Sequence, residues 1–362
     1  GMTGGGYTFL MKFANGKVTV AGDTAVAAPT ERATSSYTVD RSMGPVLSFN
    51  TYNDIFHFLG EPTYGNIEGE QGDWEFVITK LTEDSIFVKG KKWENEMVFT
   101  RMADGVDWTS YLDSIADVQK RLGVNYSVGN SSDASKMVEI NSATRRILSR
   151  TADGQVVEQP FYVTPTGIHA VNEPVALGED KAQDFLVSKA GVLTAKDNEN
   201  LTLNSYAPGI DTWVGNWTLS AMQGSCDMTI SKVEDQENML KGTFTAGGYT
   251  YNIGLSFNPE TGALNLPSQL IDDPSGRYPA LWLMNADLNK GTLLGKGGMN
   301  VVWHGVSQEG DFEDDGTLAS EGYASDTFIA LACTAKGEPI KENGQFVFVI
   351  EWYYLSNLTP NK

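Results

Sequence analysis

Cysteine, histidine and basic residues are scarce in this sequence of 362 residues. It contains two cysteines, Cys226 and Cys333, three histidines, and 26 Lys and Arg against 46 Asp and Glu. Two cysteines cannot form a disulfide framework, and we expect them to stay unbonded because a chain this long buries a sufficient core without a bridge. The net charge of −20 disfavours contact with nucleic acid or an anionic membrane surface, so we predict no nucleic-acid partner.

The sequence also lacks a long apolar run and the common catalytic motifs. No run approaches the ~20 apolar residues of a membrane-spanning helix, so we predict no transmembrane segment. His57, His169 and His304 are far apart and outside the HExxH and HxH spacings. There is no GxSxG elbow, phosphate loop or GxGxxG turn after a strand, so we predict no cofactor and assign no catalytic residue.

Short apolar strands separated by turn residues are abundant instead. Asn15-Gly16 lies between two apolar runs, which is a strong hairpin signal, and residues 74–80 alternate apolar and polar side chains. Consecutive strands with tight turns form up-and-down sheets that often close into barrels. The fold prediction is therefore all-β and mostly antiparallel, with calycin-like meander or barrel domains and one or two short helices.

We divide the chain into three segments. Residues 1–122 are predicted to be a β meander or barrel with a closing helix, and residues 123–210 a second β-rich segment packed on the first. Residues 211–362 are predicted to be a C-terminal barrel or sandwich. The closing helix is expected after Asp107 as its cap, because apolar residues recur there at helical spacing before Gly123. The strings GGYTF at 5–9 and GGYTY at 247–251 also suggest two related small barrels.

Two groups of residues are candidate binding sites. The sequence is rich in aromatic residues, with eight Trp and fourteen Tyr, and flat aromatic faces can hold sugar rings. Tyr278, Trp282 and Trp303 lie in or near the irregular segment 267–310, where an aromatic platform could form, whereas the alternating aromatic and aliphatic residues of 346–354 are predicted to be core. The candidate metal ligands are Asp311, Glu313 and Asp315 in the densest acidic run, although we expect residues 309–316 to be a mobile solvated loop without a metal.

Four strings resemble a known family. They are GGYTFLMKF at 5–13, GPVLSFNTYN at 44–53, GDWEF at 72–76 and PFYVTPTGI at 160–168. The sequence resembles the lipoproteins of Bacteroidetes grouped as domain-of-unknown-function family 4302. The resemblance implies a secreted, lipid-anchored protein of the cell envelope without an assigned activity.

The start of the sequence departs from that family's pattern. Family members usually begin with a signal peptide, a lipidated cysteine and a segment before the Gly-Gly-Tyr strand, whereas here Met2 is followed almost directly by that strand. We expect the lipid anchor and at least one further strand on an upstream segment, and an edge of the first sheet that is open or patched. If Met2 is the true start, the alternative is a cytoplasmic protein.

The function that these observations favour is a non-catalytic binding or scaffold lipoprotein of the cell envelope, on the outer membrane. Its expected partner is a polysaccharide or an envelope protein. One alternative is a carbohydrate-active hydrolase with an unassigned carboxylate pair. The other is a carrier of an apolar ligand inside a calycin-like cavity.

Overall fold

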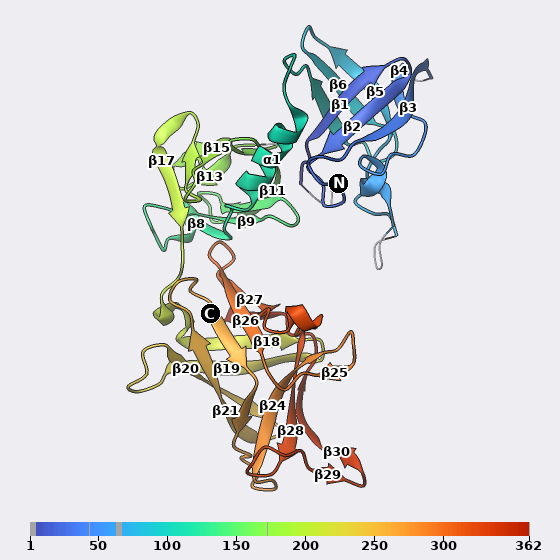
Figure 1. Cartoon of the computed structure of the whole chain (residues 1–362). Coiled ribbons are helices and arrows are strands. Elements are labelled where there is room, and N and C mark those ends of the chain that lie inside the picture. The colour runs from blue at the N-terminus through green and yellow to red at the C-terminus, as the bar shows by residue number, and fades with distance from the viewer. Residues whose placement is uncertain (1–4, 43, 63–66, 172, 362) are drawn as a thin grey trace. The chain divides into compact units, whose positions relative to one another are not determined.

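The computed structural model describes residues 5–42, 44–62, 67–171 and 173–361 of the chain. It divides them into two compact units, Gly1–Ser205 and Tyr206–Lys362. All strand pairs among the described residues are antiparallel, and one α-helix is present, so the predicted all-β class is confirmed (Figure 1). Each unit is described separately below.

The first unit begins with a seven-stranded meander, which we call the N-terminal sheet. Asn15 and Gly16 take positive φ angles of 50° and 70° and form the predicted hairpin between the first two strands. The strands are β1 (Phe9–Ala14), β2 (Lys17–Gly22), β3 (Ala33–Arg41), β4 (Pro45–Phe49), β5 (Glu75–Leu81), β6 (Ser85–Gly90) and β7 (Glu96–Thr100). A 3₁₀ turn, η1 (His57–Gly60), lies between β4 and β5.

The N-terminal sheet curls around its own core but does not close. Inward-facing residues such as Val18, Val20 and Phe76 are fully buried. The rings of Phe13 on β1 and Phe99 on β7 lie 6.1 Å apart between centroids, so the two edge strands face each other. Among the described residues β1 pairs only with β2 and β7 only with β6, which leaves an open seam between them.

A helix and a closed barrel complete the first unit. Helix α1 (Trp108–Gln119) begins at the predicted cap, where the Asp107 carboxylate accepts a hydrogen bond of 2.7 Å from the Ser110 N–H. The eight barrel strands follow one another around the ring, and a small hairpin, β13–β14, interrupts them. The strands are β8 (Asn125–Val128), β9 (Met137–Asn141), β10 (Arg146–Arg150), β11 (Val156–Thr164), β12 (Gly167–Ala170), β13 (Val175–Leu177), β14 (Asp180–Ala182), β15 (Asp184–Val187), β16 (Leu193–Ala195) and β17 (Asn198–Ser205), and η2 is Ala134–Lys136.

A buried ion pair connects the N-terminal sheet to this barrel. Arg145, in the β9–β10 turn, donates to the Asp23 carboxylate at 2.8 Å and to the carbonyl oxygens of Asp23 and Gly6. Its guanidinium also lies 4.3 Å from the centroid of the Tyr7 ring. Gly5 passes so close that a Cβ there would lie 2.2 Å from the Arg145 carbonyl oxygen, which explains the glycine.

The second unit is built on another closed eight-stranded barrel. Its strands are also consecutive around the ring, but long insertions separate β22 from β26 and β27 from β32. Short 3₁₀ turns, η3 (Ile210–Trp213) and η4 (Ala319–Glu321), precede the first strand and follow β27. The barrel strands are β18 (Gly215–Ala221), β19 (Gly224–Lys232), β20 (Met239–Ala246), β21 (Tyr249–Phe257), β22 (Leu264–Pro267), β26 (Gly298–His304), β27 (Glu309–Asp314) and β32 (Asn357–Pro360).

The two insertions combine into a five-stranded sheet. One face packs on the hydrophobic core of the unit through residues such as Leu281, Leu283 and Ile350. The sheet contains β23 (Gln269–Ile271), β24 (Ala280–Asp287), β25 (Thr292–Leu293), β28 (Thr327–Cys333) and β31 (Phe348–Trp352), and β29 (Lys341–Glu342) and β30 (Gln345–Phe346) form a separate hairpin.

The prediction that the alternating residues of 346–354 are core is only partly right, because β31 contains a bulge. Ala330 of β28 pairs with Ile350, but the next residue, Leu331, pairs with Phe348, so Val349 is an extra residue in β31. The extra residue reverses the side of the sheet to which the side chains before it in β31 point. Ile350 and Trp352 stay buried, whereas Phe346 and Phe348 are 41% and 46% exposed.

The two similar strings at 5–9 and 247–251 do not mark a structural repeat. Gly5 and Gly6 hydrogen-bond to Thr144 and Phe161 of the barrel, before β1 begins. Gly247 and Gly248, in contrast, form the turn between β20 and β21, with φ angles of 58° and 82°. The same letters therefore serve two different backbone roles.

Both cysteines are free, as expected. Cys226 on β19 is partly buried, and Cys333 at the end of β28 is fully buried. Burial raises the pKa of both thiols, which keeps them protonated and unreactive at neutral pH.

Replacing Arg145 with Met should destabilise the first unit in a pH-dependent way. Burial raises the pKa of Asp23 to about 6, and the Arg145 guanidinium works against that rise. Without Arg145 the pKa of Asp23 rises further above its unfolded value, so the folded state binds the proton more tightly and loses stability as the pH increases. We expect a loss of about 3–5 kcal/mol at pH 8 and a smaller loss at pH 5, measured by urea unfolding.

Lys89→Met is the control for this variant. Lys89 pairs with Glu94 at 2.9 Å on the exposed surface, and such pairs contribute about 0–1 kcal/mol. Equal losses for Arg145→Met at pH 5 and pH 8 would show that the buried Asp23 carboxylate is not the cause.

Candidate functional site

The structure separates Trp303 from the other two residues of the predicted aromatic platform. Trp303 is only 6% exposed and packs in the barrel interior against Trp213 and Trp217, with ring centroids 5.5 and 6.2 Å away. Gly310 on the neighbouring strand makes room for this cluster, because a Cβ there would lie 2.6 Å from the Trp213 ring. Trp303 is therefore a core residue and not part of an exposed surface.

Tyr278 belongs to an exposed polar cluster, which we call the Glu342 cluster: Arg277, Tyr278 and Glu342. The Tyr278 hydroxyl donates to the Glu342 carboxylate at 2.9 Å, and Arg277 donates to both oxygens of that carboxylate at 2.9 and 3.0 Å. The Arg277 guanidinium also lies 5.0 Å from the centroid of the Tyr278 ring. The Tyr278 hydrogen bond, followed by Arg277, lowers the pKa of Glu342 below its ordinary value.

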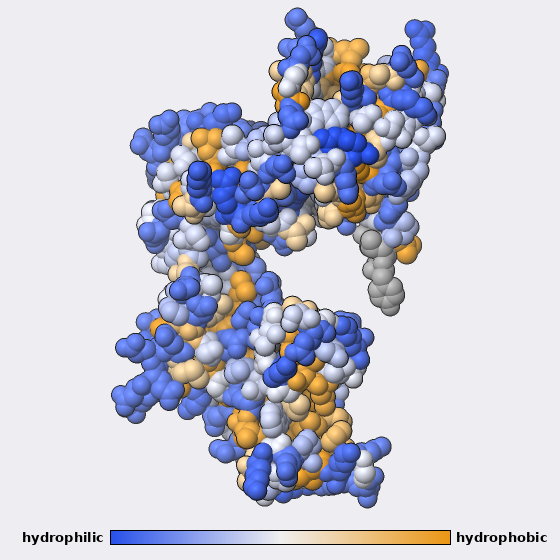
Figure 2. All heavy atoms as spheres, in the orientation of Figure 1, coloured by the Kyte–Doolittle hydropathy of each residue, from blue (hydrophilic) through white to orange (hydrophobic). Residues whose placement is uncertain are grey.

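Trp282 lies in a row of apolar residues across the outer face of the five-stranded sheet. In register, Leu270 of β23 pairs with Trp282 of β24, Trp282 with Leu331 of β28, and Leu331 with Phe348 of β31. We call Leu270, Trp282, Phe346 and Phe348 the aromatic face. Figure 2 shows a band of hydrophobic residues over β24 and β28 on the surface of this unit.

The aromatic face and the Glu342 cluster are neighbours. Phe346 pairs with Lys341 in the β29–β30 hairpin, directly beside the pair formed by Glu342 and Gln345. The Lys341 ammonium lies 4.6 Å from the centroid of the Phe346 ring. Because neighbouring residues of a strand point to opposite faces, the Glu342 carboxylate leaves this hairpin on the face opposite to Phe346 and Lys341.

The indole N–H of Trp282 has no hydrogen-bond partner among the described residues. The backbone turn at Gly337 lies against its ring, because a Cβ there would be 2.6 Å from the indole. A buried donor without an acceptor is uncommon and costs about 1–3 kcal/mol.

The acidic run forms a strand and not a mobile loop. Asp311 and Glu313 lie on β27, which pairs with β26 and β32, and Asp311 is 3.4 Å from the His304 imidazole. The Asp315 carboxylate accepts a hydrogen bond of 2.8 Å from the Thr317 N–H. Within the part of the chain that the structure describes, no three His, Cys, Asp or Glu side chains are placed to hold a metal ion.

The three histidines occupy three separate places. The His57 imidazole accepts a hydrogen bond of 3.0 Å from the Asn53 N–H, and burial lowers the pKa of His57. His169 pairs with Asp184 at 2.9 Å on the barrel of the first unit. His304 lies beside Asp311 in the second unit. This arrangement brings no two histidines together.

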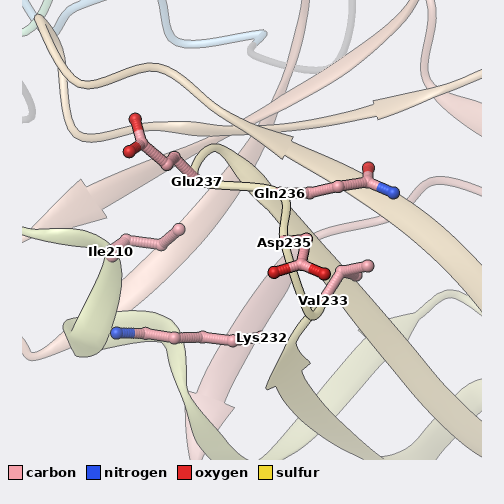
Figure 3. A pocket seen from close by; sticks show the side chains of 6 residues that line it. All are labelled: Ile210, Lys232, Val233, Asp235, Gln236 and Glu237. Atoms are coloured by element: carbon pink, nitrogen blue, oxygen red, sulfur yellow. The ribbon is translucent and has the colours of Figure 1, made fainter.

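A surface hollow of about 590 Å³ lies beside η3 in the second unit. It is lined by Ile210 and by residues of the β19–β20 turn, including Lys232, Asp235 and Glu237. Figure 3 shows the Asp235 and Glu237 side chains pointing in different directions.

The barrel interiors are lined by packed side chains. In the first unit the inward-facing residues, among them Tyr126, Phe161 and Ile168, form one buried cluster with α1. In the second unit the tryptophans and the residues around Leu240 and Val301 form another. Side chains commonly fill eight-stranded barrels in this way.

Sequence reasoning names Tyr278 and Trp282 as candidates but not the residues that they contact. Glu342 lies 64 residues from Tyr278 along the chain. Phe346 and Phe348 were assigned to the core because their alternation predicts one continuous strand face. Nothing in the local sequence indicates the bulge that turns these two rings outward.

Comparison with known proteins identifies the first half of the chain. The family model Domain of unknown function (DUF4302) matches residues 1–189. Comparisons with the curated proteins and with the solved structures give no match. No described helix is long and apolar enough to cross a membrane.

The Glu342 cluster makes a direct prediction for carboxylate titration. Tyr278→Phe removes the hydroxyl donor, so the pKa of Glu342 should rise toward its ordinary value. The measurement is carboxyl-carbon NMR across the acidic range. Tyr353→Phe, which removes the hydroxyl donated to Glu351 in the same unit, should leave Glu342 unchanged. An unchanged pKa of Glu342 in Tyr278→Phe would contradict the assigned contact.

Proposed function

Because the chain belongs to the DUF4302 family, a family of unknown function, we propose a function from the geometry of the second unit. The protein is a non-catalytic binding or scaffold protein of the cell envelope. Its ligand surface is the aromatic face together with the Glu342 cluster on the other face of the β29–β30 hairpin, and its ligand is a polysaccharide.

The observation that carries the proposal is the bulge in β31. A regular strand would direct Phe348 to the same side as Ile350, into the core of the unit. The bulge instead leaves Phe346 and Phe348 on the surface, at a cost in buried apolar area, and Phe348 shares a cross-strand row with Trp282 in which the buried Leu331 lies between them. Bulges commonly redirect side chains at functional sites, and exposed apolar patches commonly mark binding surfaces.

The chemistry of the surface suits a sugar. The C–H faces of a pyranose ring are weakly apolar and pack on aromatic rings, whereas its hydroxyl groups need hydrogen-bond partners. Glu342 keeps lone pairs as acceptors and Arg277 keeps further N–H donors, whereas the one proton of the Tyr278 hydroxyl is already donated to Glu342 and orients that carboxylate. A carboxylate fixed by two donors is already oriented, which lowers the entropy lost on binding.

The envelope location is supported by the resemblance to secreted, lipid-anchored proteins at residues 5–13, 44–53, 72–76 and 160–168. This part of the proposal expects the native product in the outer-membrane fraction of the host cell. Recovery of the protein only in the cytoplasmic fraction would contradict it.

Affinity electrophoresis tests the binding surface. The full chain is run through native gels that contain one polysaccharide each, from a panel of bacterial-envelope, plant and mucin glycans. We expect at least one glycan to retard the protein, and Phe348→Ala or Glu342→Gln to weaken that retardation by about tenfold, as the loss of a central contact does. Phe348 is half-exposed, so its truncation should leave the unit folded.

Tyr353→Ala is the matched control. Tyr353 also donates its hydroxyl to a glutamate, Glu351, but it follows β31 at the end away from Phe348. Retardation should be unchanged in this variant. Absence of retardation by every glycan in the panel would contradict the sugar assignment, and equal retardation of all three variants would place the binding surface elsewhere.

A further inference from the structure

The N-terminal sheet has two unpaired edges that face each other. Among residues 5–42, 44–62 and 67–171, β1 forms its ladder with β2 alone and β7 with β6 alone. Each edge therefore presents backbone N–H and C=O groups that no strand satisfies. Proteins normally cover or close such edges, because they accept strands from other chains.

Strand parity explains why the sheet does not close on itself. All six pairings from β1 to β7 are antiparallel, so in a seven-stranded meander the first and last strands run in the same direction. The two closed barrels of this chain each have eight strands, and their first and last strands are antiparallel. One more strand, antiparallel to both β1 and β7, would give the N-terminal sheet the same closure.

The burial of inward-facing residues also indicates an incomplete wall. Val18 and Val88, inside the sheet on β2 and β6, are 0% and 2% exposed. Their direct partners on the edge strands are Phe13 and Met97, which face inward as well. Phe13 is nevertheless 38% exposed, and Met97 is only partly buried. The core is thus covered at the centre of the sheet and open along the seam.

We infer that the seam between β1 and β7 binds one extended β-strand of another polypeptide. The bound strand runs antiparallel to both edges and directs apolar side chains, at alternate positions, toward Phe13, Met97 and Phe99. Its backbone satisfies both edges at once. This site lies on a different surface from the glycan site proposed above and does not depend on it.

A single strand fits the seam better than a second copy of the chain. Two-fold pairing of β1 with β1 of another molecule satisfies one edge and leaves β7 unpaired. Pairing of β7 with β7 of another molecule leaves β1 unpaired. The Phe13 and Phe99 rings are in contact, with centroids 6.1 Å apart, so the two edges lie too close together to admit a folded sheet between them.

Hydrogen exchange on the full chain tests this inference. The probe is a synthetic peptide of alternating Thr and Val with Lys at both ends, and the control is the same peptide with Pro at its centre, which cannot pair as a strand. In the free protein, amides of β1 and β7 should exchange faster than those of β4. At about ten times its Kd, the Thr-Val peptide should slow exchange in both β1 and β7 by about tenfold, by mass action.

Two variants locate the binding. Phe13→Glu places a charge in the inward row of the seam and should abolish the protection by the peptide. Val156→Glu changes a residue of similar exposure on β11 of the closed barrel in the same unit and should preserve it. If Phe13→Glu proves unfolded, the comparison of the two peptides on the unmodified chain still decides the question.

Three results would overturn the inference. One is strong protection of β1 and β7 in the free monomer, which would mean that the seam is already closed. Another is protection of neither edge, or of one edge alone, by the Thr-Val peptide. The last is a concentration-dependent dimer, detected by sedimentation, that protects the seam without any peptide and so assigns it to a second copy.

Discussion

Backbone hydrogen bonding between antiparallel neighbours is the constraint that shapes this molecule. A meander of antiparallel strands returns to its start in the correct direction only when the number of strands is even. Among the residues that the structure describes, two of the three large meanders have eight strands and close, whereas the third has seven and stays open. The same rule therefore accounts for two self-contained barrels and for a sheet whose edges are unsatisfied.

The open sheet is held in place by its contact with the first barrel. Arg145 and Asp23 are nearly inaccessible to water, and Arg145 also binds the backbone of the segment that leads into β1. The outer face of β1 and β2 adds apolar contacts, since Leu10 and Ala21 pack in the same cluster as the barrel residues. Residues 5–205 consequently form one compact unit although they contain two sheets.

Features fixed by neighbouring residues could be predicted from the sequence. The Asn15-Gly16 hairpin and the helix capped by Asp107 depend on local backbone geometry, and the structure has both. Features fixed by distant residues could not be predicted. The contact of Tyr278 with Glu342 depends on how two insertions meet, and the exposure of Phe348 depends on one extra residue in β31. A period of two also cannot show whether a tryptophan such as Trp303 lines a barrel or a surface.

The order of strands in the second unit has a consequence for its synthesis. The barrel is closed by β32, which pairs with β18 some 140 residues earlier in the chain, and both insertions lie between them. While the chain is emerging from the ribosome, β18 has one neighbour and an exposed edge until β32 becomes available. In the first unit the wait is shorter, because β8 pairs with β17 about 75 residues later. Nascent chains should therefore be most prone to mispairing and most dependent on chaperones during synthesis of the second unit.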